Sequence, residues 1–174
     1  MELNETQLRK LVERIMELTL ELTESNNVKK EILVVLAGKN QEQLKTALKA
    51  LPDSSDENRT LVVTKELMEN EELGQLICKS CEKIVQPEEV LSKPLSYEKL
   101  IFPAMPRDIL AKCALCIPDT YEVALVQKAF EESVPIVLSK NALSPFTGNE
   151  PESYQNCILG YIQKLLEYGI EIEL

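Results

Sequence analysis

The chain of 174 residues contains no histidine, and this absence has the widest consequences. Histidine is the side chain whose unperturbed pKa lies nearest neutrality, so its absence excludes Ser/His and Cys/His nucleophilic arrangements and most catalytic zinc sites. Any acid–base chemistry must therefore use carboxylates, lysines or a cofactor. Tryptophan is also absent, and there are only five glycines. Neither a G-x-G-x-x-G dinucleotide fingerprint nor a Walker phosphate loop is present.

Positive charge is also in short supply, because 19 Lys and Arg residues face 29 Asp and Glu residues and leave a formal net charge of −10. No basic stripe offsets this locally, so we expect no nucleic-acid partner. The N-terminus carries Glu2 and Glu5 where a signal peptide needs cations. No apolar run approaches the roughly 18 to 20 residues that cross a bilayer. We therefore expect a cytoplasmic protein with no membrane partner.

The five cysteines are typical of free thiols in a reducing compartment rather than of a disulfide framework. Two pairs, Cys78-x-x-Cys81 and Cys113-x-x-Cys116, have a spacing that a four-thiolate zinc site could use. The second pair, however, lies in a helical apolar pattern, where cysteine acts as a small buried hydrophobe. We therefore predict no metal site. A thiol redox role for the first pair is disfavoured too, since that pair ends a predicted helix instead of opening one.

Residues 4–24 place apolar side chains at three- and four-residue steps, which predicts an amphipathic helix. The polar run Ser25-Asn26-Asn27 ends it. We therefore predict an N-terminal helix and break over residues 1–27, followed by one α/β domain over residues 28–174. Two interpretations of the helix stay open: it packs on its own domain or on a partner subunit, or it is a docking element.

From residue 31 onward, short apolar runs rich in β-branched residues alternate with helical segments, which is typical of βαβ units. The continuous apolar runs 32–36 and 136–138 indicate strands covered on both faces, as in a parallel sheet. The predicted strands are 32–37, 60–64, 83–86, 99–103, 135–139 and 169–173. The predicted helices are 41–51, 69–79, 108–117, 121–132 and 152–167, and residues 86–96 are expected to form a loop. The sequence thus predicts a doubly wound three-layer sandwich with a mostly parallel sheet, of the Rossmann or flavodoxin-like type.

A ligand of such a fold lies outside the carboxyl ends of the strands. The first strand is followed by Gly38-Lys39-Asn40, where a glycine permits close approach and a helix start offers N–H groups to a phosphate. An ordinary strand-to-helix turn is an equally good interpretation of this segment. Thr64, after the second strand, could bond a ligand or simply cap a turn.

The loop after the fourth strand is the most unusual segment of the chain. Two prolines fix its backbone, Arg107 supplies a guanidinium fork suited to phosphate, and Asp108 is expected at the helix N-cap. With Ala104 and Met105, these residues complete the set of candidate ligand-binding residues in the sequence.

The segment from Pro103 to Asp119 resembles the homo-oligomeric flavin-containing cysteine decarboxylases, of the phosphopantothenoylcysteine decarboxylase type. In that family a Pro-Ala-x-x-Asn/Asp loop leads into an Ile-Ala-Lys helix and a Gly-x-Ala-Asp-Asn-like turn. Asp108, Lys112 and Asp119 fall on the family's Asn/Asp, Lys and Asp. The similarity continues through 124–130 into the strand 134–138. It implies FMN as cofactor, with its phosphate near residues 38–40, its ring near Thr64 and 104–108, and a site completed within a trimer.

The chain also departs from that family. The active-site histidine is missing, and residues 139–146 replace the family's substrate flap, so we expect the decarboxylase chemistry to be absent. Residues 104–112 and 145–151 further resemble relatives associated with bacterial microcompartments, in which an N-terminal amphipathic helix docks cargo. The resulting hypothesis is an FMN-binding accessory or redox flavoprotein, possessing a docking helix at residues 4–24. The alternative is a non-catalytic assembly protein with a degenerate flavin site.

Overall fold

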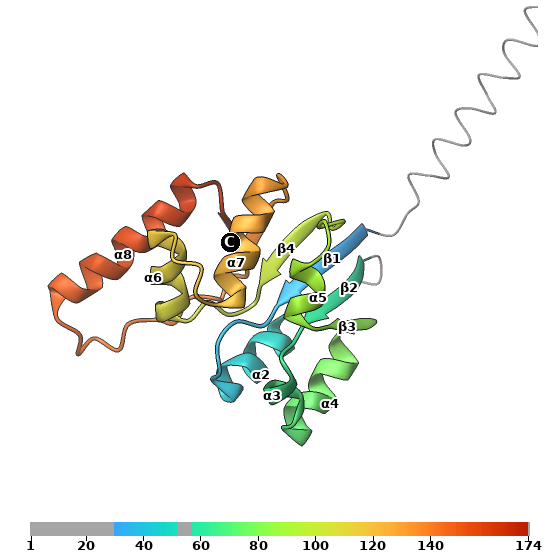
Figure 1. The fold of residues 1–174 in the computed structure, drawn as a ribbon. Helices are drawn as coiled ribbons and strands as arrows, with labels where there is room; N and C mark the ends of the chain where they lie inside the picture. Colours follow the sequence, from blue (N-terminus) through green and yellow to red (C-terminus); the bar gives the residue numbers. More distant parts are fainter. Residues whose placement is uncertain (1–29, 52–56, 174) are drawn as a thin grey trace, which may run out of the picture.

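Six parallel strands form the centre of the computed structural model, which describes residues 30–51 and 57–173 (Figure 1). Their order across the sheet is β3-β2-β1-β4-β5-β6, and every neighbouring pair is parallel. This is the strand order of doubly wound dinucleotide-binding folds. The strands are β1 (Lys30–Val35), β2 (Glu57–Val62), β3 (Lys83–Val85), β4 (Lys99–Phe102), β5 (Ile136–Leu138) and β6 (Glu171–Ile172).

Helices cover both faces of this sheet. Successive residues of a strand point to opposite faces, so each buried strand contributes side chains to both helical layers. In β1, Ile32 and Val34 pack with the first helical layer, while Leu33 and Val35 pack with the second. The first layer contains α2 (Gln41–Ala50), α3 (Lys65–Met68) and α4 (Glu71–Ser80). The second contains α5 (Pro87–Leu91), α6 (Arg107–Leu115), α7 (Tyr121–Glu131) and α8 (Glu152–Glu167).

The predicted fold class is confirmed, and in the described residues the sheet is entirely parallel instead of mostly so. One prediction of local structure was wrong, and one short helix was not predicted. The expected loop 86–96 contains the short helix α5, which begins with a proline at its first position. The segment after β2 forms α3 before the predicted helix, which begins at Glu71. The predicted N-terminal helix 4–24 lies outside the described residues.

Candidate functional site

A cavity of about 1100 Å³ opens at the carboxyl edge of the sheet, where the strand order reverses between β1 and β4. In open α/β sheets, ligands bind in the crevice at this switch point. Its walls are the segments after β1, β2, β3, β4 and β5, together with the start of α7. Of the eight predicted site residues, six line the cavity: Gly38, Lys39, Asn40, Thr64, Arg107 and Asp108.

The turn after β1 forms one end of this cavity. Gly38 has φ +83°, and a Cβ on it would lie 2.5 Å from Cγ of Pro106, so only glycine permits this close approach of two loops. Asn40 is the N-cap of α2, and its side-chain oxygen accepts the N–H of Gln43 at 3.2 Å. Lys39 is exposed and its ammonium lies 3.6 Å from the carboxylate of Glu66. The turn therefore combines a helix N-terminus with an exposed cation.

Thr64 lies in the N-cap position of α3, but its side chain makes no capping hydrogen bond. The interpretation of Thr64 as a simple helix cap is therefore not supported by the geometry. The residue lies in the wall of the cavity instead.

Ala104 and Met105, the other two residues predicted to bind a ligand, do not line the cavity. Their side chains are 1% and 0% exposed and belong to the two hydrophobic cores on opposite sides of the sheet. The backbone N–H of Met105 donates to the carbonyl of Ala142, so this residue ties the loop after β4 to the loop after β5. Asp108 lines the cavity from the first turn of α6, but the N-cap is Pro106, so the predicted capping role of Asp108 was wrong.

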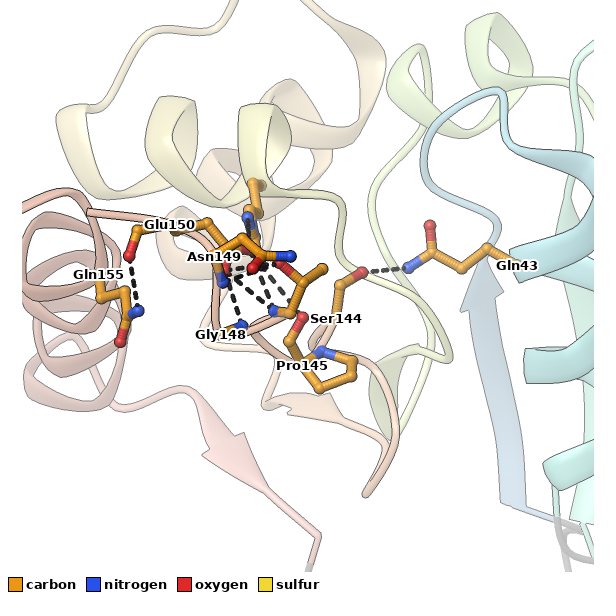
Figure 2. A network of polar contacts seen from close by, with 9 residues as sticks. Gln43, Ser144, Pro145, Gly148, Asn149, Glu150 and Gln155 are labelled. Atoms are coloured by element: carbon orange, nitrogen blue, oxygen red, sulfur yellow. Dashed lines mark hydrogen bonds and ion pairs between the residues drawn. The ribbon is translucent and has the colours of Figure 1, made fainter. Parts of the chain in front are cut away.

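The guanidinium of Arg107 was predicted to bind a phosphate, but groups of the protein itself accept its hydrogen bonds. Both terminal nitrogens donate to the same carboxylate oxygen of Glu150 at 3.2 Å, and one also donates to the carbonyl of Pro145 (Figure 2). The guanidinium also stacks over the ring of Phe146, 4.9 Å from its centroid. Arg107 therefore holds the loop after β5 and is not a free fork for phosphate.

Glu150 is the centre of this loop network. The backbone N–H groups of Thr147 and Gly148 donate to its carboxylate, and Arg107 forms an ion pair with it. Figure 2 shows the cluster of contacts around Glu150. Burial works against the charged form, but hydrogen bonds from its own N–H, from Thr147 and from Arg107 outweigh it and lower the pKa of Glu150 to about 2. Farther along the loop, Ser144 accepts a hydrogen bond from Gln43 of α2 at 3.0 Å, so the loop also contacts the opposite wall.

Sequence reasoning missed three cavity residues at the start of α7. Glu122 is 4% exposed and accepts the backbone N–H of Gly38 at 3.1 Å. Tyr121 donates its hydroxyl to the carbonyl of Leu36, and burial, followed by the charge of Glu122, raises its pKa well above the ordinary value. The hydroxyl of Thr120 is buried and has no partner among the described residues. No local pattern could have found these residues, because Glu122 and Gly38 are 84 positions apart.

The cavity wall is electrically balanced. Its acidic side chains are equal in number to its basic ones: Glu66, Glu88, Asp108 and Glu122 against Lys39, Lys65, Arg107 and Lys112. Two of the cations are held in ion pairs with residues outside the cavity, since Arg107 pairs with Glu150 and Lys112 lies 3.0 Å from Asp119. The cavity is thus a mixed-charge site and not a strongly cationic one.

The cysteine pairs lie in different layers, so they do not form one metal site. Cys78 and Cys81 belong to the end of α4, while Cys113 and Cys116 belong to the end of α6 on the other face of the sheet. No cluster of three or more potential ligands occurs in residues 30–51 and 57–173. Burial, with smaller effects of Glu122 and Cys116, raises the pKa of Cys113 to about 12.

No protein-family model and no curated protein sequence matches the chain, but solved structures match its fold. A dodecameric FMN-dependent Ubix-like decarboxylase from Escherichia coli O157:H7 aligns with a TM-score of 0.58 over 82% of this chain and 77% of its own, at 15% identity. The FMN-dependent cysteine decarboxylase TvaF from thioviridamide biosynthesis aligns with a TM-score of 0.58 over 83% and 90%, at 11% identity. The chain has the fold of these flavoproteins.

A third structure with this flavoprotein fold is DmrB from Burkholderia xenovorans, in complex with FMN and described as a cubic protein cage for redox transfer. It aligns with a TM-score of 0.52 over 83% of this chain and 87% of its own, at 15% identity. The flavoprotein fold thus occurs in decarboxylases and in a redox protein. In the described part of this chain, no helix has the length and apolar character needed to span a membrane.

Proposed function

We propose that this chain is an FMN-binding flavoprotein with a redox or accessory role and without cysteine decarboxylase activity. The observation that carries the proposal is the cavity at the switch point, built on the first strand-to-helix turn of a flavoprotein fold. Its volume of about 1100 Å³ lies just above the roughly 300 to 1,000 Å³ found for small-molecule pockets, so the cavity is large enough for such a cofactor. The absence of histidine argues against the decarboxylase chemistry.

The residues in the cavity wall fit such a cofactor. The phosphate would bind at the start of α2, where Asn40 caps the helix and Lys39 adds a cation. The partnerless hydroxyl of Thr120 offers a hydrogen bond that no described residue satisfies, and Thr64 offers another. Apolar side chains for a flat ring come from Pro106 and Ile109. When bound, FMN would supply hydride or electron transfer, and these residues would bind and orient it.

The proposal is tested by titrating the full-length protein with FMN and following flavin fluorescence. We expect saturable binding that Lys39→Glu weakens by at least about tenfold, the scale of one charge-assisted hydrogen bond. Lys140→Glu is the matched control, because Lys140 is an exposed lysine that does not line the cavity. Absence of binding to the wild-type chain, or equal weakening by both variants, would count against the proposed site.

The second candidate is a non-catalytic assembly protein that keeps the fold with a degenerate flavin site. It is favoured by the balanced charges of the cavity and by the engagement of Arg107 with Glu150. A colourless preparation that takes up no added FMN would support this candidate over the first.

We further propose that the chain forms a homo-trimer or a higher homo-oligomer. Large apolar side chains between 40% and 50% exposed occur on the helices of the second layer and on the segments that follow them, and a subunit interface would cover them. They are Leu115, Ile117, Phe130, Tyr154, Leu159, Leu166 and Tyr168. Residues 4–24 would then dock the oligomer to a microcompartment shell or cargo protein. Native mass spectrometry of the full chain tests the oligomer directly.

A further inference from the structure

Glu122 is the only charged residue among the buried side chains of the described part of the chain. Burying a carboxylate is costly unless charges or hydrogen bonds compensate it. No ion pair of Glu122 occurs within residues 30–51 and 57–173. Its carboxylate accepts the backbone N–H of Gly38 at 3.1 Å and also interacts with the hydroxyl of Tyr121. A buried acid held by a neutral partner at the wall of a ligand cavity is better explained by function than by folding alone.

The position of Glu122 matters because of the group it contacts. Gly38 opens the turn that leads into α2, and in doubly wound folds the amides of this turn bind the ligand's phosphate. The carboxylate of Glu122 already occupies one of these amides. Burial is the main cause that raises the pKa of both Tyr121 and Cys113, and the negative charge of Glu122 is the next.

A phosphate and a ribityl hydroxyl respond to this carboxylate in opposite ways. A phosphomonoester carries a charge of about −1.5 to −2 near neutrality, and a buried carboxylate close by repels it through a poorly screened field. A hydroxyl is neutral and can donate a hydrogen bond to the carboxylate. Glu122 therefore penalises the phosphate of FMN without penalising the rest of the molecule.

We propose that Glu122 is a specificity-determining residue that reduces the preference of this cavity for phosphorylated over unphosphorylated flavin. The proposal rests on the function proposed above and narrows the ligand class of the same site. The measurable quantity is the ratio of the riboflavin dissociation constant to the FMN dissociation constant. Any effect of the substitution on binding of the flavin ring cancels in this ratio, so the ratio reports only the contribution of the phosphate to binding.

Riboflavin and FMN are titrated separately into the full-length protein, into Glu122→Gln and into Glu131→Gln. The glutamine at 122 can still accept the N–H of Gly38, so it removes the charge and keeps the contact. Glu131 is an exposed acid at the other end of α7 that does not line the cavity, and it controls for the change in net charge.

We expect the wild-type ratio to stay below about fivefold, and the ratio in Glu122→Gln to rise by at least about tenfold, as removal of a nearby like charge predicts. Glu131→Gln should leave the ratio within about twofold of wild type, because surface charges are screened. A wild-type preference for FMN of about a hundredfold or more would overturn the inference without any variant. An unchanged ratio in Glu122→Gln would also overturn it. Both results leave the proposed function intact. Failure of every protein to bind either flavin overturns the proposed function itself.

Discussion

Gly38 shows how a single residue brings two loops of the cavity together. We predict that Gly38→Ala lowers the free energy of unfolding by about 2 to 5 kcal/mol, the sum of a positive-φ penalty and an overpacking penalty. Gly169→Ala is the matched control, because Gly169 has φ +88° and a Cβ added to it would meet no described atom within 4 Å. It should cost only about 1 kcal/mol. Urea denaturation of both variants measures the difference, and equal losses would mean that Pro106 moves aside.

Glu150 provides a prediction about pH. Its pKa is lowered to about 2, so the contacts of its carboxylate stabilise the folded state above the ordinary glutamate pKa of about 4.3. This stability is lost as the pH falls through the folded value. We therefore expect the difference in Tm between wild type and Glu150→Gln to be largest above about pH 5 and to shrink towards zero near pH 2. A difference that is constant over this range would mean that the charge of Glu150 does not hold the loop.

The residues of the site were only partly predictable from the sequence. Gly38, Lys39 and Asn40 could be placed, because a turn after a buried strand has a known relation to the carboxyl edge of the sheet. The true partner of Arg107 could not, because Glu150 is 43 positions away and an isolated Pro-Arg-Asp sequence does not reveal it. Glu122 was missed for the same reason, since an acid in the first turn of a helix ordinarily indicates only favourable helix polarity.

At the scale of elements, the start of α7 is fixed to the end of β1 by the hydroxyl of Tyr121. We predict that Tyr121→Phe costs about 1 to 2 kcal/mol of unfolding free energy, because it leaves the buried carbonyl of Leu36 without a donor. Tyr97→Phe is the control, since the hydroxyl of this half-buried tyrosine has no hydrogen bond to a described residue. Chemical denaturation measures the free energy of unfolding of the two variants. An equal loss in both would mean that the contact between Tyr121 and Leu36 does not stabilise the fold.

The elements themselves were predicted better than the contacts between them. The run 32–36 could be identified as a central strand because five consecutive apolar residues need burial on both faces, and all five are 0% exposed. The helix α5 was missed because five residues are too few to show a 3.6-residue period. Its proline at the first position followed by Glu88 and Glu89 was the usable signal, since both features favour a helix start.

At the scale of the whole molecule, helices within residues 30–51 and 57–173 cover both faces of the sheet. We therefore predict that deletion of residues 1–26 leaves a folded domain that keeps the cooperative thermal unfolding of the full chain. Deletion of residues 169–174 is the comparison, because it removes strand β6 and the buried Ile170 and should destabilise the fold. An insoluble or unfolded product of the first deletion would assign the N-terminal residues to the core.

The proposed flavin site is the cavity between the ends of β1 and β4. The most direct test is diffraction from crystals of the full-length protein soaked with FMN. We predict flavin density in this cavity, with the phosphate beside the turn 38–40 and the ring towards the segment that joins β4 to α6. Flavin density at another place on the molecule, or a cavity that remains free of flavin at saturating FMN, would mean that this cavity is not the flavin site.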